Sequence, residues 1–378
     1  MPAATRLSLF YAAFFLAGGV QLPFWPVWLA SRGLGPGEIG ALFAIAQWTK
    51  VAATPVIGGL ADRSGDPRRV MLGLVVLCVT GYALCIPARG FVPLTILNAI
   101  TAACLAGLLP IGESLALSHT RHGAVDYGRV RLWGTLAFVL ATLAGGPIVG
   151  GRSPEIILGL VLGLTALNLG SCALLPRAHT HLSDEGGGWH ALLAGRHLLF
   201  LATATLIAAS HSVYYAFGTL NWQAQGHSDT AIAVLWAEGA TAEAVFFFWG
   251  AKAVARWGPA ALLAAGGLSA ALRWSVLAFA VDLRILALVQ LLHAGTLAAA
   301  HLGAMHYLTR AVPPRLAATG QAVYSATVGG LGYGVFMLAS GWLYGSFGGH
   351  AYLAMAALGA AAAALALALG RAVPMTKS

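Results

Sequence analysis

The chain has 378 residues, of which 59% are hydrophobic and only 9% carry a charge, and its formal net charge is +9. Soluble globular domains are about 45–50% apolar, so this composition excludes an ordinary soluble fold. The surplus of basic residues follows membrane topology, as shown below, and gives no reason to expect nucleic acid as a partner.

Long charge-free runs follow one another along the sequence, and a bilayer core needs about 20 apolar residues per helix. The runs cover 7–31, 70–88, 90–112, 132–151, 156–176, 197–228, 285–309 and 316–370. The last run has room for two helices, with a break at the glycines around Gly345 and Gly348. Three further apolar segments hold one or two charges each, around Lys50, Glu243 and Arg273. The sequence therefore predicts an all-α integral membrane protein with twelve transmembrane helices.

The basic residues predict the orientation of these helices. Of the 21 Lys and Arg, the predicted outer loops hold only Arg32, Arg89, Arg152 and Arg284, and two more lie within spans. Cytoplasmic loops are rich in Lys and Arg, so both termini are expected in the cytoplasm. The first apolar run is too long for a signal-peptide core and is expected to remain as helix 1. The expected location is a bacterial cytoplasmic (inner) membrane.

The sequence also repeats itself. With Ile39 aligned to Ile232, the stretch that ends at Gly65 matches the stretch that ends at Gly258 without a gap, and Lys50 falls opposite Glu243. Parallel repeats of this kind are typical of transporters whose halves rock around a site near the bilayer midplane. The expected organisation is a six-helix bundle over 1–175, a cytoplasmic linker over 176–195 and a second six-helix bundle over 196–378.

A glycine-rich, charged segment follows the second span. G-G-L-A-D-R-S-G-D-P-R-R, from Gly58 to Arg69, resembles the signature between helices 2 and 3 of the major facilitator superfamily. Glycine permits a tight turn there. The resemblance implies that Asp62, Arg63, Gly65 and Arg69 form a latch that stabilises one conformation. The corresponding stretch after helix 8 has no acidic residue, so such a latch is asymmetric.

Five further motifs cover nearly the whole chain and resemble the 3-phenylpropionate transporters, which are relatives of the lactose permease and the nucleoside–proton symporters. They are L-P-F-W-P-V-W-L (22–29), D-Y-G-R-V-R-L-W-G (126–134), S-H-S-V-Y-Y-A-F-G (210–218), L-L-H-A-G-T (291–296) and Q-A-V-Y-S-A (321–326). The resemblance implies a proton-coupled symporter that imports a small organic substrate, such as an aromatic carboxylate, by alternating access and as a monomer.

One carboxylate and one arginine are expected to meet in the first half. If helix 4 ends near His119 and helix 5 begins near Asp126, Glu113 and Arg131 lie at one depth, about 9 Å and about 8 Å from those ends. The lactose permease has a Glu and an Arg with this spacing, and there the pair binds substrate. The alternative is a permanent ion pair that locks the two helices together. Ionisable residues inside membranes are usually functional.

The second half holds Glu243, Arg273 and His293, all predicted near mid-membrane. The resemblance implies that these residues bind and release the proton. Arg273 is also expected, with Arg131 in the other half, to bind the carboxylate of an acidic substrate. The resembled permease has a further carboxylate in helix 10 where this chain has Thr296, so proton binding is expected to fall to Glu243, Glu113 or a histidine. Burial favours the protonated carboxyl and a nearby Arg favours the ionised one, so a moving Arg273 would load and unload Glu243.

The remaining candidates are less specific. Tyr215 and Tyr324 are expected to face a substrate cavity, and Lys50 to be a counter-charge or to bind an anion. Phe138 falls where the lactose permease stacks a Trp on its sugar, which argues against a sugar. The deep histidines, His293 and His211 among them, are either hydrogen-bonding groups or proton relays, and no metal-ligand spacing or cofactor motif is present.

Three other classes of function compete with a symporter. A membrane enzyme would need a nucleophile with its base, or a metal site, and no such set is visible. A channel would not need two equivalent halves with charges at the midplane. Relatives that import nucleosides or sugars, and proton-driven efflux transporters of the same superfamily, remain open, because fold does not determine substrate or direction. No phosphate-binding loop is present, so ATP is not expected to drive transport.

Overall fold

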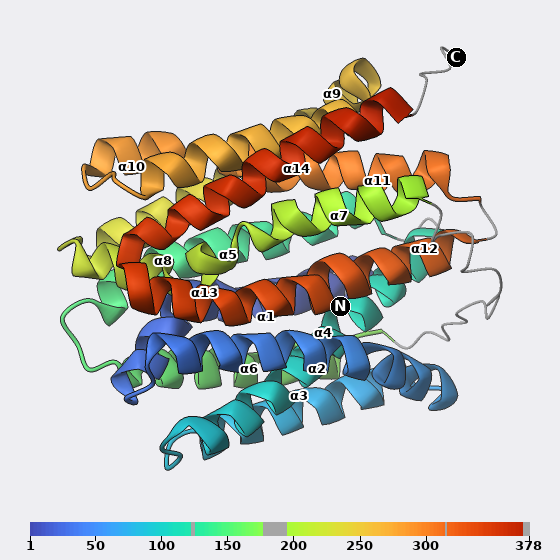
Figure 1. Ribbon diagram of the computed structural model, residues 1–378. Helices are drawn as coiled ribbons and strands as arrows, with labels where there is room; N and C mark the ends of the chain where they lie inside the picture. The colour runs from blue at the N-terminus through green and yellow to red at the C-terminus, as the bar shows by residue number, and fades with distance from the viewer. Residues whose placement is uncertain (122–124, 177–194, 314–315, 373–378) are drawn as a thin grey trace. The chain divides into compact units, whose positions relative to one another are not determined.

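The structure is a computed structural model, and it describes residues 1–121, 125–176, 195–313 and 316–372 (Figure 1). Its described residues contain helices and turns and no strand. They divide into two compact units, Met1–Ser183 with Gly226–Ala237 and Asp184–Gln225 with Glu238–Ser378. The linker predicted at 176–195 falls almost wholly outside the described residues, and the domain boundaries stay predictions.

The first unit contains six long helices. They are α1 (Ala3–Ser31), α2 (Pro36–Arg63), α3 (Pro67–Leu84), α4 (Phe91–Arg121), α5 (Tyr127–Val149) and α6 (Glu155–Leu174). Proline occupies the first position of α2 and α3, where its missing N–H has no partner to lose. Asp126 begins α5 by accepting a hydrogen bond from the Arg129 backbone N–H at 3.2 Å. Helix α1 packs against α5 and α6, and α4 packs against α2 and α3.

The second unit has more interrupted helices. They are α7 (Gly195–Ala209), α8 (Ser212–Ala224), α9 (Asp229–Leu277), α10 (Leu283–Gln290), η2 (Ala294–Ala299), α11 (Ala300–Ala311), α12 (Ala317–Tyr324), η4 (Ser325–Gly332), α13 (Tyr333–Phe347), η5 (Gly348–Ala351) and α14 (Tyr352–Ala372). The first part of α9, up to Ala237, belongs to the first unit. Gly258 divides α9, because its φ of 72° and ψ of 174° are not helical. Helices α7 and α14 run side by side (Figure 1).

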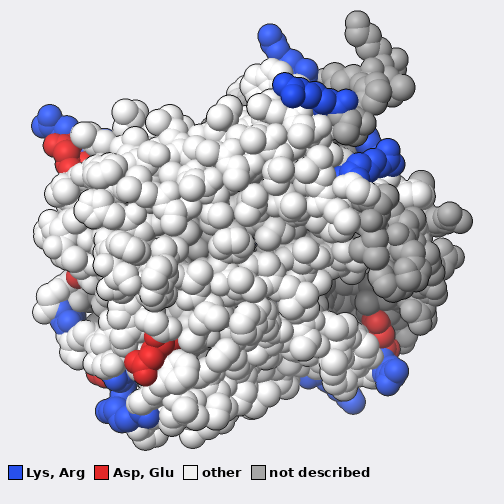
Figure 2. Space-filling model, viewed as in Figure 1, with Lys and Arg blue, Asp and Glu red and all other residues white. Residues whose placement is uncertain are grey.

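Ten stretches of the described chain are long and apolar enough to cross a membrane. One of them, Thr319–Arg371, has 53 residues and is interrupted at Gly348 (φ 54°), so it holds two helices. Helix α2 has 28 residues but is less apolar and lies outside the ten. These segments are consistent with the twelve that the sequence predicts. On the face shown in Figure 2, charged side chains gather at the helix ends and leave the surface between them uncharged.

The internal repeat is visible in the backbone. Gly33 and Gly226 have φ values of 85° and 88°, and Gly65 and Gly258 have 64° and 72°. The same number of residues separates the members of both pairs, as the sequence alignment requires. A positive φ is accessible to glycine at little cost. Corresponding helices in the two halves therefore end at a glycine with a positive φ.

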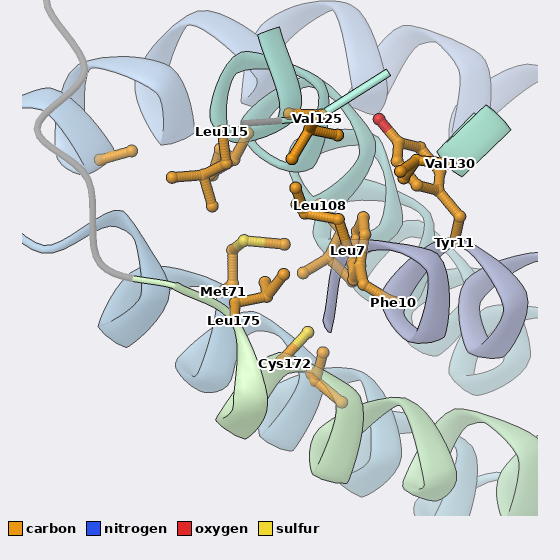
Figure 3. Packing of buried hydrophobic residues seen from close by; sticks show 14 residues of the cluster. Leu7, Phe10, Tyr11, Met71, Leu108, Leu115, Val125, Val130, Cys172 and Leu175 are labelled. Atoms are coloured by element: carbon orange, nitrogen blue, oxygen red, sulfur yellow. The ribbon is translucent and has the colours of Figure 1, made fainter. Parts of the chain in front are cut away.

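Buried apolar side chains hold α1 against α4 and α5 in the first unit (Figure 3). Phe10 and Tyr11 from α1 meet Leu108 and Leu115 from α4 and Val130 from α5, and all five are at most 3% exposed. The cluster also contains Cys172, one of four cysteines that are all buried and unpaired, as expected of packing residues. Because Val130 adjoins Arg131 and Leu115 lies two residues after Glu113, this core sets the positions of the predicted pair.

Candidate functional site

The structure brings Glu113 and Arg131 together in the first unit. Helix α4 ends two residues beyond the expected His119, and α5 begins one residue after Asp126. The Arg131 Nε atom lies 3.8 Å from the Glu113 Oε1 atom, and the two side chains are 31% and 37% exposed. This distance is within ion-pair range but too long for a hydrogen bond. The pair is therefore loose and accessible rather than a locked buried bridge.

Aromatic rings surround the arginine of this pair. The Arg131 guanidinium carbon lies 4.3 Å from the centre of the Phe15 ring and 5.4 Å from that of Tyr11. The side chain of Tyr127 interacts with both Glu113 and Arg131. A planar guanidinium stacks well on an aromatic face while its N–H groups remain free to bind an anion.

Two glycines permit this arrangement, and the residue-by-residue interpretation of the sequence missed them. A Cβ atom at Gly134 would lie 2.7 Å from the Phe15 Cδ2 atom and 3.1 Å from the Arg131 Nη1 atom. A Cβ atom at Gly112 would overlap the Phe10 ring. The close contacts of α1 with α4 and α5 therefore depend on these two positions. Gly112 stands beside Glu113, and Gly134 is the last residue of the motif at 126–134, but neither pattern indicates which ring the glycine must accommodate.

The second unit encloses Arg273 completely. Its side chain is 0% exposed, and its guanidinium lies over the rings of Tyr214 and Trp274 at 4.6 and 4.5 Å. The Arg273 Nη1 group donates to His293 Nδ1 at 2.7 Å and to Thr296 Oγ1 at 3.3 Å, and Nη2 donates to Gln290 Oε1 at 2.5 Å. All three acceptors are neutral. Within the described part of the chain, Arg273 makes no ion pair with a carboxylate.

His293 lies between Arg273 and Glu243. Because Nδ1 accepts a hydrogen bond from Arg273, the proton of the neutral ring belongs on Nε2. Nε2 faces the Glu243 carboxylate, with the Glu243 Oε2 atom 3.7 Å away. The three residues that the sequence predicts to cluster do so, in the order Arg273, His293, Glu243. Gly239, one turn before Glu243, faces His293, since a Cβ atom there would lie in ordinary contact with it at 3.5 Å.

Several polar partners of Arg273 were not predicted from the sequence. Gln290 lies three residues before His293, which is one helical turn, and it also donates to the Tyr214 hydroxyl at 3.0 Å. Its sequence signal was available, because it is a polar residue within an apolar run at i−3 from a suspected site residue. The Trp274 indole donates to Ser210 Oγ at 3.1 Å, and no sequence pattern links these two residues.

The helices of the second unit are irregular where the motifs lie. The break between α7 and α8 falls at Ser210 and His211, and π-helical segments follow directly after His293 (η2) and after Tyr324 (η4). Wide turns of this kind occur frequently at functional sites, and inside a membrane such irregular backbone is tolerated where it is buried in protein. The motifs thus coincide with the places where the backbone departs from a regular helix.

The other predicted residues lie apart from these two clusters or at their edges. Tyr215 stacks on His211 with ring centres 5.8 Å apart, next to the Arg273 cluster, and Tyr324 stacks on Phe200 at 5.9 Å. Lys50 in α2 is half-buried, and the described residues give its ammonium group no ion pair. Phe138 packs where α5 meets Gly18 and Gly19 of α1.

The predicted latch residues lie at the end of α2 and the start of α3. Asp62, Arg63 and Arg69 are exposed, and Gly65 takes the positive φ that the turn requires. Arg69 Nε lies 3.3 Å from the Asp66 carboxylate, and Asp62 has no ion pair among the described residues. In this conformation Arg69 is therefore paired with Asp66 rather than Asp62.

Comparisons with known proteins agree with these features. The family model described as "MFS_1 like family" matches residues 4–354. The chain is 32% identical over 359 residues to the probable 3-phenylpropionic acid transporter of Escherichia coli strain K12, covering 93% of each chain. The chain belongs to the major facilitator superfamily.

Other members of the superfamily that resemble this chain are named for other substrates. The maltose permease of Geobacillus stearothermophilus is 31% identical over 358 residues, with 90% of this chain and 87% of that protein covered. The crystal structure of the nucleoside transporter NupG has a TM-score of 0.86 at 14% identity, covering 98% of this chain and 99% of that one. At that identity the likeness concerns the fold alone. The chain is thus a multi-pass membrane transporter and not an enzyme.

Proposed function

We propose that the protein is a proton-coupled symporter that imports a small aromatic carboxylate, such as 3-phenylpropionate, across a bacterial cytoplasmic membrane. Both termini would lie in the cytoplasm, and one chain would be sufficient for transport. The observation that supports the proposal best is the accessible Arg131, which lies against the Phe15 ring and is held only loosely by Glu113, 3.8 Å away. A substrate with a carboxylate and a phenyl ring matches both features.

Binding of the carboxylate follows from the chemistry of arginine. The guanidinium fork forms two parallel charge-assisted hydrogen bonds with a carboxylate. In the empty protein Glu113 neutralises Arg131, and the arriving substrate replaces it. Glu113 then takes up a proton, since a carboxylate without its counter-charge in an apolar surrounding is costly. Substrate and proton are thus bound together at one pair.

The second unit supports proton coupling. His293 contacts both Arg273 and Glu243, so a movement of Arg273 changes the charge near Glu243. An Arg that approaches favours the ionised carboxylate, and an Arg that withdraws favours the protonated one. Glu243 would therefore bind a proton in one conformation and release it in the other.

A sugar is the second candidate, and one observation favours it. The maltose permease is nearly as similar to this chain as the probable 3-phenylpropionic acid transporter, at 31% against 32% identity. The residue Phe138 argues against a sugar only through a resemblance. The same residues would serve a proton-driven exporter, so the direction of transport needs its own measurement.

The test uses purified protein in proteoliposomes with an imposed pH gradient, inside alkaline. Uptake of labelled 3-phenylpropionate above its equilibrium level is expected, and it should collapse when a protonophore dissipates the gradient. Maltose, a nucleoside and 3-phenylpropanamide serve as competitors. Competition by maltose alone would refute the aromatic-acid assignment, and uptake that ignores the gradient would refute proton coupling.

A further inference from the structure

His211 occupies the break between α7 and α8 and is 1% exposed. Its ring lies 5.2 Å from the Trp274 ring and 5.9 Å from the His293 ring, both edge to face. The interruption of the helix therefore brings a second imidazole into the cluster around Arg273. The mechanism above gives this residue no role.

The hydrogen bonds of His211 assign its protons. Nδ1 lies 3.0 Å from the Ile207 carbonyl oxygen, which can only accept, so Nδ1 carries a hydrogen in every favourable state. Nε2 lies 3.1 Å from Thr296 Oγ1. When the ring is neutral, Nε2 is an acceptor and needs the hydroxyl hydrogen of Thr296.

The single hydroxyl hydrogen of Thr296 has two possible acceptors, His211 Nε2 and the His293 carbonyl oxygen. Its Oγ1 atom accepts from Arg273 Nη1 at 3.3 Å, and it lies 3.2 Å from the His293 carbonyl oxygen as well as 3.1 Å from His211 Nε2. If His211 is neutral, the hydroxyl cannot serve both acceptors. If His211 is protonated, Nε2–H donates to Thr296, and the hydroxyl donates to the His293 carbonyl. Hydrogen bonding alone thus favours the imidazolium.

Burial and charge act in the opposite direction. The ring is 1% exposed, and a surrounding without water disfavours its charged form. Arg273 is a cation in the same buried cluster, and like charges in a water-free surrounding repel strongly. The one carboxylate that the described residues place at this cluster, Glu243, lies on the far side of His293. The titratable or charged groups around His211 are Arg273 and Glu243 from α9, His293 directly before η2, Tyr214 and Tyr215 from α8, and Tyr352 from α14. Among these, Arg273 opposes protonation of His211 most directly.

We propose that His211 is a second proton-binding residue of this unit, which takes up a proton at Nε2 when the Arg273 guanidinium leaves its enclosure. This inference rests on the proposed proton-coupled function. The proton comes from water on the open side of the protein and returns to water when Arg273 comes back, so no other bond is made or broken. Thr296 is the positioning residue, because its hydroxyl turns from His211 to the His293 carbonyl as the proton arrives.

This assignment gives a reason for Thr296 at the position where the resembled permease has a carboxylate. A carboxylate there would pair with Arg273 and hold it by charge. A hydroxyl holds Arg273 weakly and can accept from His211 and donate to His293. The proton that a carboxylate at position 296 would bind is instead bound by His211, at the break between α7 and α8.

The first test is spectroscopic and independent of transport. Protein labelled with ¹⁵N-histidine is measured by NMR at pH 7, and the signal that is absent in His211→Gln is assigned to His211. We expect a neutral ring with hydrogen on Nδ1 in the wild type, and an imidazolium in Arg273→Gln at the same pH. A ring that stays neutral in Arg273→Gln would overturn the proposal, as would an imidazolium already present in the wild type.

The second test measures protons moved per substrate in proteoliposomes, from the substrate gradient that just balances an imposed pH gradient. His211→Gln is expected to move one proton fewer per substrate than the wild type while still exchanging substrate. Thr296→Val should shift the pH profile of exchange, and Thr296→Ser, which keeps the hydroxyl, should restore it. His301→Gln is the matched control, because His301 is an exposed membrane histidine that contacts Phe247 and lies outside the hydrogen bonds of Arg273.

The two levels of inference fail differently. Unchanged stoichiometry in His211→Gln together with a coupled wild type would overturn the role of His211 and leave the proposed function intact. A wild type that moves no protons would refute the proposed function. The NMR experiment would still show whether protonation of His211 depends on Arg273.

Discussion

Replacement of Arg131 by lysine tests substrate binding most directly. Lysine keeps the positive charge near Glu113 but loses the planar fork and the stacking on Phe15, whose ring centre lies 4.3 Å from the Arg131 guanidinium carbon. The protein should fold normally, because a partly exposed ion pair with a separation of 3.8 Å contributes about 0–1 kcal/mol to stability.

The loss in binding can be estimated from the contacts that disappear. One of two charge-assisted hydrogen bonds is worth about 1.5–3 kcal/mol, and loss of the guanidinium–ring contact adds about 0.5–1 kcal/mol at an accessible site. Release of Arg131 from Glu113 costs little because their contact is loose. A net loss of about 2–4 kcal/mol corresponds to a dissociation constant about 30- to 700-fold higher for the acid.

The assay is a thermal-shift or calorimetric titration of two ligands against two proteins. 3-Phenylpropionate and 3-phenylpropanamide share the ring and the chain but differ in charge. Wild type should prefer the acid strongly, and Arg131→Lys should lose most of that preference while its affinity for the amide changes little. At a ligand concentration of 100 Kd the wild type gains about 2.7 kcal/mol of stability, which is easily measured. A wild type that binds acid and amide equally would refute the reasoning and favour a sugar or a nucleoside.

Three further changes probe other parts of the structure. Glu243→Gln keeps the shape of the side chain but cannot release a proton, so uphill accumulation should fall while exchange of preloaded substrate persists. Unchanged accumulation would remove Glu243 as a proton site. Asp62→Asn, in the exposed last turn of α2, should lower turnover much more than binding, and equal losses measured by uptake and by titration would argue against a latch. Gly134→Ala puts a methyl group 2.7 Å from Phe15 Cδ2 and should destabilise the protein by about 1–3 kcal/mol through overpacking, measured as thermal unfolding. Gly159→Ala in α6 is its control, since a Cβ atom there meets nothing within 4 Å; an equal loss in both variants would contradict the packing argument.

The sequence alone predicts the number of membrane spans and the positions of the charged residues within them. A bilayer tolerates a charge inside a span only at a cost, so Glu113, Arg131, Glu243 and Arg273 stand out from the apolar runs by their charge alone. The same physics limits helix length and makes the number of spans predictable. The internal repeat aligned Gly65 with Gly258, and the structure gives both residues a positive φ, because a tight turn after a helix favours glycine in both halves.

The tertiary structure decided which groups meet those charges. The faces that two helices present to each other depend on packing, and π-helical segments such as η2 alter the register after His293, so counting along the sequence does not predict neighbours there. Hence Gln290, Tyr214 and His211 emerged as parts of the Arg273 cluster only in three dimensions. The sequence determined that a buried arginine, a histidine and a carboxylate share one unit. Only the fold placed His293 between the other two, because the packing of α9 against the irregular helix at His293 brings Arg273 to Nδ1 and Glu243 to the Nε2 side of the ring.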